Sequence, residues 1–230
     1  MKLIVLKKSI IITVLAIIFA IVAIGVCAGA LAVTAFKSEG DRVVVIDAGH
    51  GGIDAGVVGR VTGVKESDIN LAIAKQLKSY FSEAGFTVVM TRTSNGGLYG
   101  LPNSGFKMRD MKKRKQIIEE SSADMVISVH QNSCPLESRR GGQVFFNPDS
   151  ECGKALADCI QSSLNNMKEC VKKSSALAGD YYMLKCTESP SVIVECGFLT
   201  NGEDEKLLSS PDYQKSVAYA IFKGAVSYYG

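Results

Sequence analysis

The sequence predicts an α/β domain in which helices pack against a central sheet. After residue 40, apolar strand segments alternate with amphipathic helical segments, and no internal repeat interrupts the alternation. The first strand segment is an almost unbroken run of Val and Ile, which is typical of a strand covered on both faces. With 230 residues, the chain is long enough to form one large hydrophobic core. We therefore expect one folded domain with a short additional segment.

The expected elements follow one another in a regular order. The first strand, RVVVIDAG at 42–49, leads through a glycine-rich loop into a helix over 67–84, where apolar residues recur at helical spacing. The strand FTVVMTR at 86–92 is followed by a glycine- and asparagine-rich loop at 94–106 and then a helix over 109–122. The remaining expected elements are strands at 124–130, 141–147 and 181–185 and helices at 152–168 and 211–229. Within SVIVECGFLTN at 191–201, an apolar strand run is expected to end at Glu195 and a glycine.

The N-terminal segment is expected to cross a membrane. Residues 9–36 carry no charge and exceed the roughly 20 residues that a helix needs to span the bilayer. Lys2, Lys7 and Lys8 precede this run, which favours a cytoplasmic start and an exported C-terminal domain. The expected organisation is a basic cytoplasmic segment at 1–8, a transmembrane signal anchor at 9–36, a linker at 37–42 and a catalytic domain at 43–230.

Two alternatives exist for this segment. Ala28, Ala30 and Ala32 provide the small residues of a signal-peptide cleavage site, although the apolar run is longer than the ~7 to 15 residues of a signal-peptide core. Cys27 could indicate a lipoprotein, but Val26 before it is bulkier than lipoprotein processing usually accepts. The uncleaved anchor is therefore favoured.

Composition argues against several other classes of protein. The net charge of +3 is too small to indicate a nucleic acid partner. The seven cysteines lack both the dense spacing of a disulfide scaffold and any C-x-x-C pair, so most are expected to be buried free thiols. The loop GHGGIDAGVVG lacks the frame of a phosphate-binding motif. No G-x-S-x-G sequence surrounds Ser128, which argues against a serine hydrolase.

Four residues that could perform chemistry are expected at one edge of the sheet. His50, His130 and Glu195 lie at or just beyond the C-terminal ends of predicted strands, where parallel α/β sheets bind ligands. Glu66 lies at the junction of the first loop and helix and could fold back over the same edge. Two imidazoles and a carboxylate match a zinc site that keeps a fourth position for water. Glu195 could then accept the proton of that water.

Structural interpretations of the same residues are also open. A single histidine at a strand end is more often a structural residue than a ligand, although two such histidines make this explanation weaker. Glu66 could be explained by the favourable interaction of an acidic residue with a helix N-terminus. Glu195 is harder to explain in this way, because an unpaired carboxylate within SVIVECGF would be costly to bury and needs a partner.

Four sequence blocks carry a family resemblance. They are VVVIDAGHGG, VKESDINLAIAKQLKSYFSEAGFTVVMTR, Arg114 followed by ADMVISVHQN, and PSVIVECGFLTN. In this order they resemble the zinc-dependent N-acetylmuramoyl-L-alanine amidases of the Amidase_3 family, and the resemblance covers nearly all of 41–230. It implies a three-layer sandwich with a mixed, mostly parallel six-stranded sheet flanked by helices, similar to that of zinc exopeptidases. It also implies one Zn²⁺ held by His50, Glu66 and His130, with Glu195 as the catalytic glutamate.

The resemblance implies cleavage of the amide between muramic acid and L-alanine of peptidoglycan stem peptides. A membrane-anchored catalytic domain without wall-binding repeats is most similar to the CwlD amidases of spore cortex synthesis, whose product muramic-δ-lactam is needed for germination. The implied partners are peptidoglycan, the membrane through the N-terminal helix, and an activating protein such as some family members need. The implied location is the extracytoplasmic side, either anchored in the membrane or secreted after signal cleavage.

Departures and alternatives accompany this resemblance. Gln131 stands where many members have alanine, and Glu119 where many have asparagine. Arg109, Arg114 and Arg139 could grip stem-peptide carboxylates, although an exposed arginine is more often a surface residue. The alternative functions are a zinc peptidase that acts on cell-wall peptides and a catalytically silent, membrane-anchored domain that binds peptidoglycan.

Overall fold

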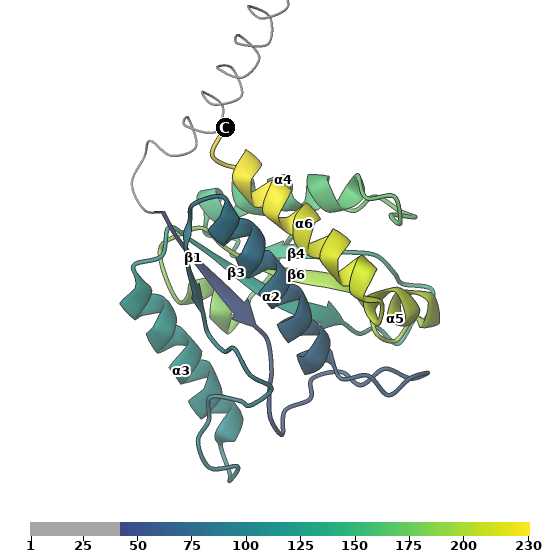
Figure 1. Cartoon of the computed structure of the whole chain (residues 1–230), viewed down its shortest axis with the longest axis horizontal. Coiled ribbons are helices and arrows are strands. Elements are labelled where there is room, and N and C mark those ends of the chain that lie inside the picture. Colours follow the sequence, from purple (N-terminus) through teal and green to yellow (C-terminus); the bar gives the residue numbers. More distant parts are fainter. Residues whose placement is uncertain (1–41) are drawn as a thin grey trace, which may run out of the picture. The chain divides into compact units, whose positions relative to one another are not determined.

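A six-stranded sheet lies between two layers of helices (Figure 1). The computed structural model describes residues 42–230, so the expected segments at 1–8 and 9–36 and nearly all of the linker at 37–42 lie outside the described residues. Within 42–230, no helix combines the length and apolar character that crossing a membrane requires. The elements are β1 (Val43–Ala48), α2 (Glu66–Glu83), β2 (Thr87–Met90), α3 (Phe106–Ser121), β3 (Met125–Asn132), β4 (Gln143–Phe146), α4 (Glu151–Asn165), β5 (Leu177–Ala178), η1 (Tyr182–Lys185), β6 (Ser191–Phe198), α5 (Gly202–Leu208) and α6 (Pro211–Ser227).

The sheet is mixed and mostly parallel, as the family resemblance implies. Its strand order is β2-β1-β3-β6-β4-β5. The strands β2, β1, β3 and β6 are parallel to one another, whereas β4 is antiparallel to β6, and β5 is parallel to β4. The C-terminal ends of β1, β3 and β6 therefore meet at one edge near the centre of the sheet.

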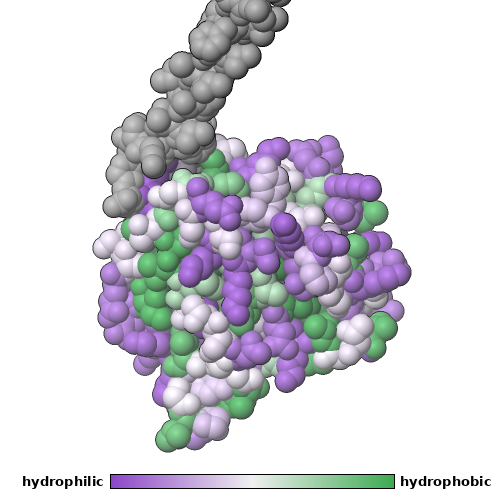
Figure 2. Space-filling model, in the orientation of Figure 1, coloured by the Kyte–Doolittle hydropathy of each residue, from purple (hydrophilic) through white to green (hydrophobic). Residues whose placement is uncertain are grey.

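The alternation of side chains along β1 explains why both faces of the sheet are covered. Val44 and Ile46 are buried in the larger core, which lies under α2, α4 and α6. Val45 points to the opposite face and packs in a smaller core with Ile118 of α3 and Met183 of η1. The prediction that the first strand is buried on both faces is therefore confirmed. Hydrophilic residues dominate the outer surface over the larger helical layer, with scattered apolar residues between them (Figure 2).

The prediction of a strand at 181–185 is wrong. This segment contains the 3₁₀ turn η1, in which the amide of Leu184 donates to the carbonyl of Tyr181. A strand would direct Met183 and Leu184 to opposite faces, whereas the turn buries both neighbouring side chains. The sixth strand is instead β5, a two-residue edge strand that pairs with β4.

Two further details differ from the sequence-based expectations. The helix α5 was not predicted, and it begins where the side chain of Asn201 accepts hydrogen bonds from two backbone amides of its first turn. The six cysteines of the described residues are free, as expected, but only Cys186 and Cys196 are buried. The expectation that most of them are buried is wrong, because the other four lie on α4 and on loops where the helical layers cover them only partly.

Candidate metal centre and active site

The edge formed by the central parallel strands brings together the four predicted site residues. His50 follows β1 by two residues, and His130 belongs to β3, which runs two residues farther than predicted. Glu195 lies within β6 and is the direct register partner of His130. Glu66 is the first residue of α2, at the end of the loop that returns from His50. Adjacent strands and one helix N-terminus therefore direct these residues to a single place.

Three of these residues form a cluster that could hold a metal ion. Ligand-capable atoms of His50, Glu66 and His130 all lie within 4.8 Å of one another. Oε1 of Glu66 lies 3.0 Å from Nδ1 of His130 and 3.3 Å from Nε2 of His50. The Glu66 side chain is buried, and both imidazoles are about one-quarter exposed, so the cluster opens to solvent on the histidine side. Two imidazole nitrogens and a carboxylate are the donor set of catalytic zinc sites.

The glycine-rich loop after β1 gives the ligands room. His50 itself adopts a left-handed conformation with φ of 60°. A Cβ on Gly49 would lie 2.2 Å from the imidazole of His130, and a Cβ on Gly56, which has φ of 66°, would lie 2.4 Å from Oε2 of Glu66. These glycines therefore permit a close approach of backbone to ligand side chains and do not form a phosphate-binding loop.

Hydrogen bonds outside the cluster fix the orientation of His50. Its Nδ1 lies 2.9 Å from Oδ2 of Asp54, and Oδ1 of Asp54 lies 3.3 Å from Nζ of Lys107. This contact leaves Nε2 of His50 directed towards Glu66. A carboxylate that engages the second ring nitrogen is the usual support for a metal-bound histidine. The carbonyl of His50 accepts a 2.6 Å hydrogen bond from the guanidinium of Arg114.

Hydrogen bonds from backbone and side-chain amides fix the position of the Glu66 carboxylate. The amide of Val57 donates to Oε2 at 2.8 Å, and the amide of Gln131 donates to Oε1 at 3.1 Å. The side-chain amide of Asn70 donates to Oε1 at 3.3 Å and to the carbonyl of Gly49 at 3.1 Å. Asn70 in turn accepts a hydrogen bond from the side chain of Gln131. The side chain of Gln131, a position where many proteins of the resembling family have alanine, therefore helps to support Glu66 through Asn70.

The charges of the cluster change the acidity of its members. Burial alone would lower the pKa of His50, but the hydrogen bonds and negative charges of Glu66 and Asp54 outweigh it and raise that pKa to about 9. Burial would raise the pKa of Glu66, whereas its contacts with His130 and His50 lower it far below the usual range. The cluster therefore contains a carboxylate that stays ionised and an imidazole whose proton a metal must displace.

Glu195 lies in a different electrostatic environment. Burial raises its pKa to about 7, and the negative charge of Glu66 contributes in the same direction. Its Oε2 is buried, and no group of residues 42–230 forms a hydrogen bond with it. The sequence led us to expect a partner for the Glu195 carboxylate, but residues 42–230 supply none for Oε2. Burial instead raises the pKa of Glu195, so that its neutral form is favoured. A carboxyl group with a pKa near neutrality is suited to accept and return a proton.

A buried ion network lies directly beneath the site. Arg114, which is 2% exposed, donates to Asp110 and Asp47 at 2.6 Å each and to the carbonyl of Ala48 at 2.7 Å. Burial would raise the pKa of Asp47, but the positive charge of Arg114 and the hydroxyl of Ser128 are among the groups that lower it to about 2. Arg114 therefore has a structural role as the buried counterion of Asp47 and Asp110.

The structure also decides the role of two arginines that could have gripped substrate. Arg114 cannot contact a substrate carboxylate, because it is buried and its donors are engaged. Arg109 donates to the backbone carbonyls of Tyr99, Leu101 and Ser104 and so holds the preceding loop. Both are structural residues. The guanidinium of Arg139 lies 5.8 Å from the centre of the Phe198 ring.

Two cavities open beside the cluster, and both are lined by His50, Asp54, Lys107 and His130. One, of about 260 Å³, has a wall of apolar and aromatic side chains from α3, from η1 and the residue before it, and from β6, namely Met111, Tyr181, Tyr182, Met183 and Ile193. The other, of about 330 Å³, is polar and is lined in addition by Glu66, Gln131, Asn132, Ser133 and Glu195. The cluster therefore lies between a mainly apolar cavity and a polar one. This arrangement suits a ligand with one apolar part and one polar part.

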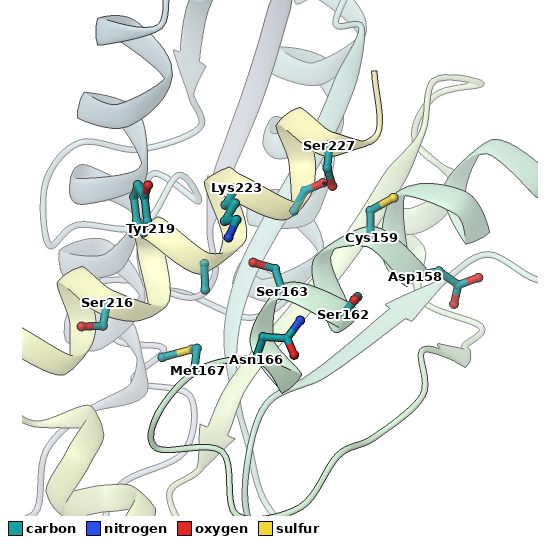
Figure 3. A pocket seen from close by; sticks show the side chains of 12 residues that line it. Asp158, Cys159, Ser162, Ser163, Asn166, Met167, Ser216, Tyr219, Lys223 and Ser227 are labelled. Carbon is teal, nitrogen blue, oxygen red and sulfur yellow. Dashed lines mark hydrogen bonds between the residues drawn. The ribbon is translucent and has the colours of Figure 1, made fainter. Parts of the chain in front are cut away.

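A third cavity, of about 570 Å³, lies in the groove between α4 and α6 (Figure 3). Serine hydroxyls, Asn166, Asp158 and Lys223 line it, and its lining contains no histidine. The metal-capable cluster and the carboxyl group with a pKa near neutrality both lie at the strand edge instead. The chemistry of the described residues therefore places the candidate active site at that edge.

Sequence reasoning found the four central residues but missed their supports. Asp54 and Lys107 were not singled out, nor was Asn70, although the spacing of four between His50 and Asp54 was a possible signal. Arg114 belongs to the run KKRK, which resembles a solvated face, so nothing in the sequence indicated that it is buried. Lys107 is separated from the cluster by many residues and gave no local signal.

The sequence matches a family of known proteins. The family described as Amidase_3, N-acetylmuramoyl-L-alanine amidase, matches residues 44–227. The chain is 33% identical over 192 residues to the germination-specific N-acetylmuramoyl-L-alanine amidase of Bacillus subtilis, covering 82% of this chain and 80% of that protein. It is 29% identical over 237 residues to the amidase AmiA of Escherichia coli, covering 84% and 78% of the two chains.

Solved structures with a similar fold include two amidases. The CwlD amidase from Clostridioides difficile, in complex with the GerS lipoprotein, has a TM-score of 0.79 and 35% identity, covering 82% of this chain and 98% of that one. The amidase AmiC2 of Nostoc punctiforme has a TM-score of 0.71 and 30% identity, covering 84% and 99% of the two chains.

Proposed function

This chain belongs to the N-acetylmuramoyl-L-alanine amidase family, and from this premise we propose that it hydrolyses the amide between muramic acid and L-alanine of peptidoglycan with one bound Zn²⁺. We assign His50, Glu66 and His130 as the metal ligands and Glu195 as the catalytic residue. The observation that carries this proposal is the cluster of three donors within 4.8 Å beside a buried glutamate whose pKa is about 7.

The donor set fits zinc on chemical grounds. His50 and His130 are the nitrogen ligands and Glu66 the oxygen ligand of a three-residue site, which leaves a position open for water or substrate. The hydrogen bonds of Glu66 with Val57 and Gln131 hold its carboxylate in place before a metal binds. When bound, Zn²⁺ supplies a water of lowered pKa and polarises the amide carbonyl.

Glu195 moves the proton in this mechanism. Its carboxylate accepts the proton of the water that attacks the amide carbonyl and then donates it to the departing nitrogen of alanine. A pKa of about 7 makes both transfers accessible near neutral pH. Its buried Oε2 has no protein partner within 42–230, so this oxygen is free to take part in the transfer.

The experiment is to digest purified muropeptides with the full-length chain in detergent and to identify the products by mass spectrometry. We expect muramic acid without its peptide and a peptide with a free alanine amine. Glu195→Gln is expected to keep zinc and lose turnover, and His130→Ala is expected to lose both. Peptides shortened while still joined to muramic acid would indicate a zinc peptidase, and binding without products at matched zinc would indicate a silent binding domain. A fully active His130→Ala variant would exclude the proposed ligand set.

We also propose where the domain works. Cell-wall amidases related to this chain act outside the cytoplasm, and the uncharged run at 9–36 supports an anchor with residues 43–230 on the extracytoplasmic side. Membrane fractionation followed by protease treatment of intact cells tests this arrangement. A chain that stays protected from external protease would contradict it.

The role we propose is in synthesis of the spore cortex. Similarity to the germination-specific amidase and to CwlD supports this role, and the complex of CwlD with GerS supports a protein partner for this chain as well. Expression in a spore former that lacks its own germination-specific amidase, with and without a GerS-like lipoprotein, tests both points. Spores without muramic-δ-lactam in either case would contradict the cortex role.

A further inference from the structure

Two cavities lie beside the metal-capable cluster. Among the residues that line them, Lys107 is the one cation that is open to a ligand. It is the second residue of α3 and lines both cavities together with His50 and His130. Its side chain is 68% exposed, whereas Arg114, the other cation of the lining, is 2% exposed. All three nitrogens of the Arg114 guanidinium already donate to protein acceptors. An anionic group of a substrate could therefore be neutralised here only by Lys107 or by the bound metal.

The surroundings of Lys107 make its charge important. The same cavities are lined by Asp47, Asp54, Asp110, Glu66 and Glu195, which would repel an anionic substrate. The single positive charge of Arg114 offsets part of the negative charge of the two aspartates beneath the site, and a bound metal would offset Glu66. Away from the metal itself, a substrate carboxylate is therefore expected to be favoured in the lining only near the Lys107 ammonium.

Asp54 holds the Lys107 ammonium near the cluster without using all of its donors. Nζ lies 3.3 Å from Oδ1 of Asp54, whose other oxygen engages His50. This is the one polar contact of Lys107 within the described part of the chain. An ammonium group has three N–H donors, so two remain for a ligand. The geometry is that of a cation held by Asp54 beside the metal-capable cluster, with donors left for a ligand.

The substrate of the proposed function carries a matching anion. In peptidoglycan stem peptides the second residue is D-glutamate linked through its side chain, so that its α-carboxyl is either free or amidated. This group lies about one extended residue, roughly 3.5 Å, beyond the alanine whose amide is cleaved. An anion-binding group beside the metal cluster is therefore in the right region of the site.

We propose that Lys107 binds the free α-carboxylate of the second stem-peptide residue and makes the enzyme prefer free-acid stem peptides to amidated ones. This inference rests on the proposed amidase function. A hydrogen-bonded charge pair in a partly enclosed site corresponds to a preference of about tenfold or more in kcat/KM.

The test uses two muropeptides that differ only at this carboxyl, one with D-glutamate and one with D-isoglutamine. Wild-type protein, Lys107→Met, Lys107→Arg and the control Lys113→Met are compared by kcat/KM on both. Lys113 is exposed on the same helix, donates a hydrogen bond to Gln116 and lines neither cavity, so replacing its side chain should leave the site unchanged. We expect Lys107→Met to lose the preference by slowing the acid substrate, Lys107→Arg to keep most of it, and Lys113→Met to keep all of it.

Binding and metal content separate this role from a structural one. Calorimetry with Glu195→Gln should show tighter binding of the acid than of the amide, and the double variant Glu195→Gln/Lys107→Met should bind both alike, with zinc content unchanged. Equal slowing of both substrates by Lys107→Met would show that Lys107 only supports Asp54 and would overturn the proposal. So would a wild-type enzyme that cleaves both substrates equally well. Cleavage of neither would instead contradict the amidase function itself.

Discussion

Replacing Arg114 with methionine should strongly destabilise the domain. Methionine preserves much of the side-chain volume but leaves Asp47, which is 1% exposed, as a buried carboxylate without its cation. Asp110 and the carbonyl of His50 lose hydrogen bonds of 2.6 Å at the same time. Removing one partner of a buried ion pair costs about 3–5 kcal/mol. That is a large part of the roughly 5–15 kcal/mol that stabilises a typical domain.

The sign of the pH dependence follows from Asp47. In the wild type its folded pKa of about 2 lies below the unfolded value of about 3.9, so its contribution is complete above pH 4 and is lost as the pH falls from 4 to 2. Without the guanidinium, burial raises the folded pKa of Asp47 above its unfolded value, and the variant then loses stability as the pH rises. The difference between wild type and variant should therefore be largest at neutral pH and shrink towards pH 4.

The assay is urea unfolding followed by circular dichroism at pH 7.5, 6 and 4.5. At pH 7.5 we expect the midpoint to fall by roughly 2 M urea, given a slope of about 2 kcal/mol per molar for a domain of this size. Lys115→Met is the control, because Lys115 lies next to Arg114 and forms only an exposed ion pair with Glu119. Equal urea midpoints for the two variants would refute the assignment of Arg114 as the buried counterion of Asp47. A difference in stability between wild type and Arg114→Met that stays constant with pH would refute it as well.

Three further predictions concern the metal site and the helical layer. Zinc affinity should rise about tenfold per pH unit between pH 6 and 8, because the metal displaces the proton of His50, whose pKa is about 9. Asp54→Asn should weaken zinc binding by about 10- to 100-fold in a chelator competition, and unchanged affinity would contradict the orienting role of Asp54. Gly224→Ala should cost about 1–3 kcal/mol in calorimetric unfolding, since its Cβ would lie 2.5 Å from Cα of Ile160. Gly202→Ala, whose Cβ would meet nothing closer than 3.7 Å, is the matched control, and equal melting of both variants would contradict that close approach.

Elements with several turns or alternations could be predicted from the sequence, and the short ones could not. The ends of β1 and α2 lie within one residue of the predicted ones, because each contains enough apolar repeats to define a period. The strand β5 has two residues and therefore no period at all. An apolar run as short as that of η1 does not distinguish a strand from a turn. The helix α5 did carry a signal, since Asn201 precedes three acidic residues of the first turn.

The candidate site shows a similar division. Histidines that follow apolar strands can be recognised locally, because the strand pattern determines which edge they reach. Contacts such as Asp54 with Lys107 depend on how a loop and a distant helix pack, which no local pattern encodes. Arg114 lies in a basic run that suggests exposure, yet Asp47 and Asp110 draw it into the interior. Glu195 was predicted to need a partner, and the fold provides only its burial.

The strand order also determines when, during synthesis of the chain, each candidate site residue becomes available. The cluster of His50, Glu66 and His130 is complete once β3 has been synthesised, whereas Glu195 arrives much later, with β6. Yet β6 is central to the sheet, where it inserts between β3 and β4. Chains are made and begin to fold from the N-terminus. A chain that ends after β3 would therefore contain the three metal-capable residues but would lack Glu195, the residue to which we assign proton transfer, so we expect no hydrolysis before β6 is in place.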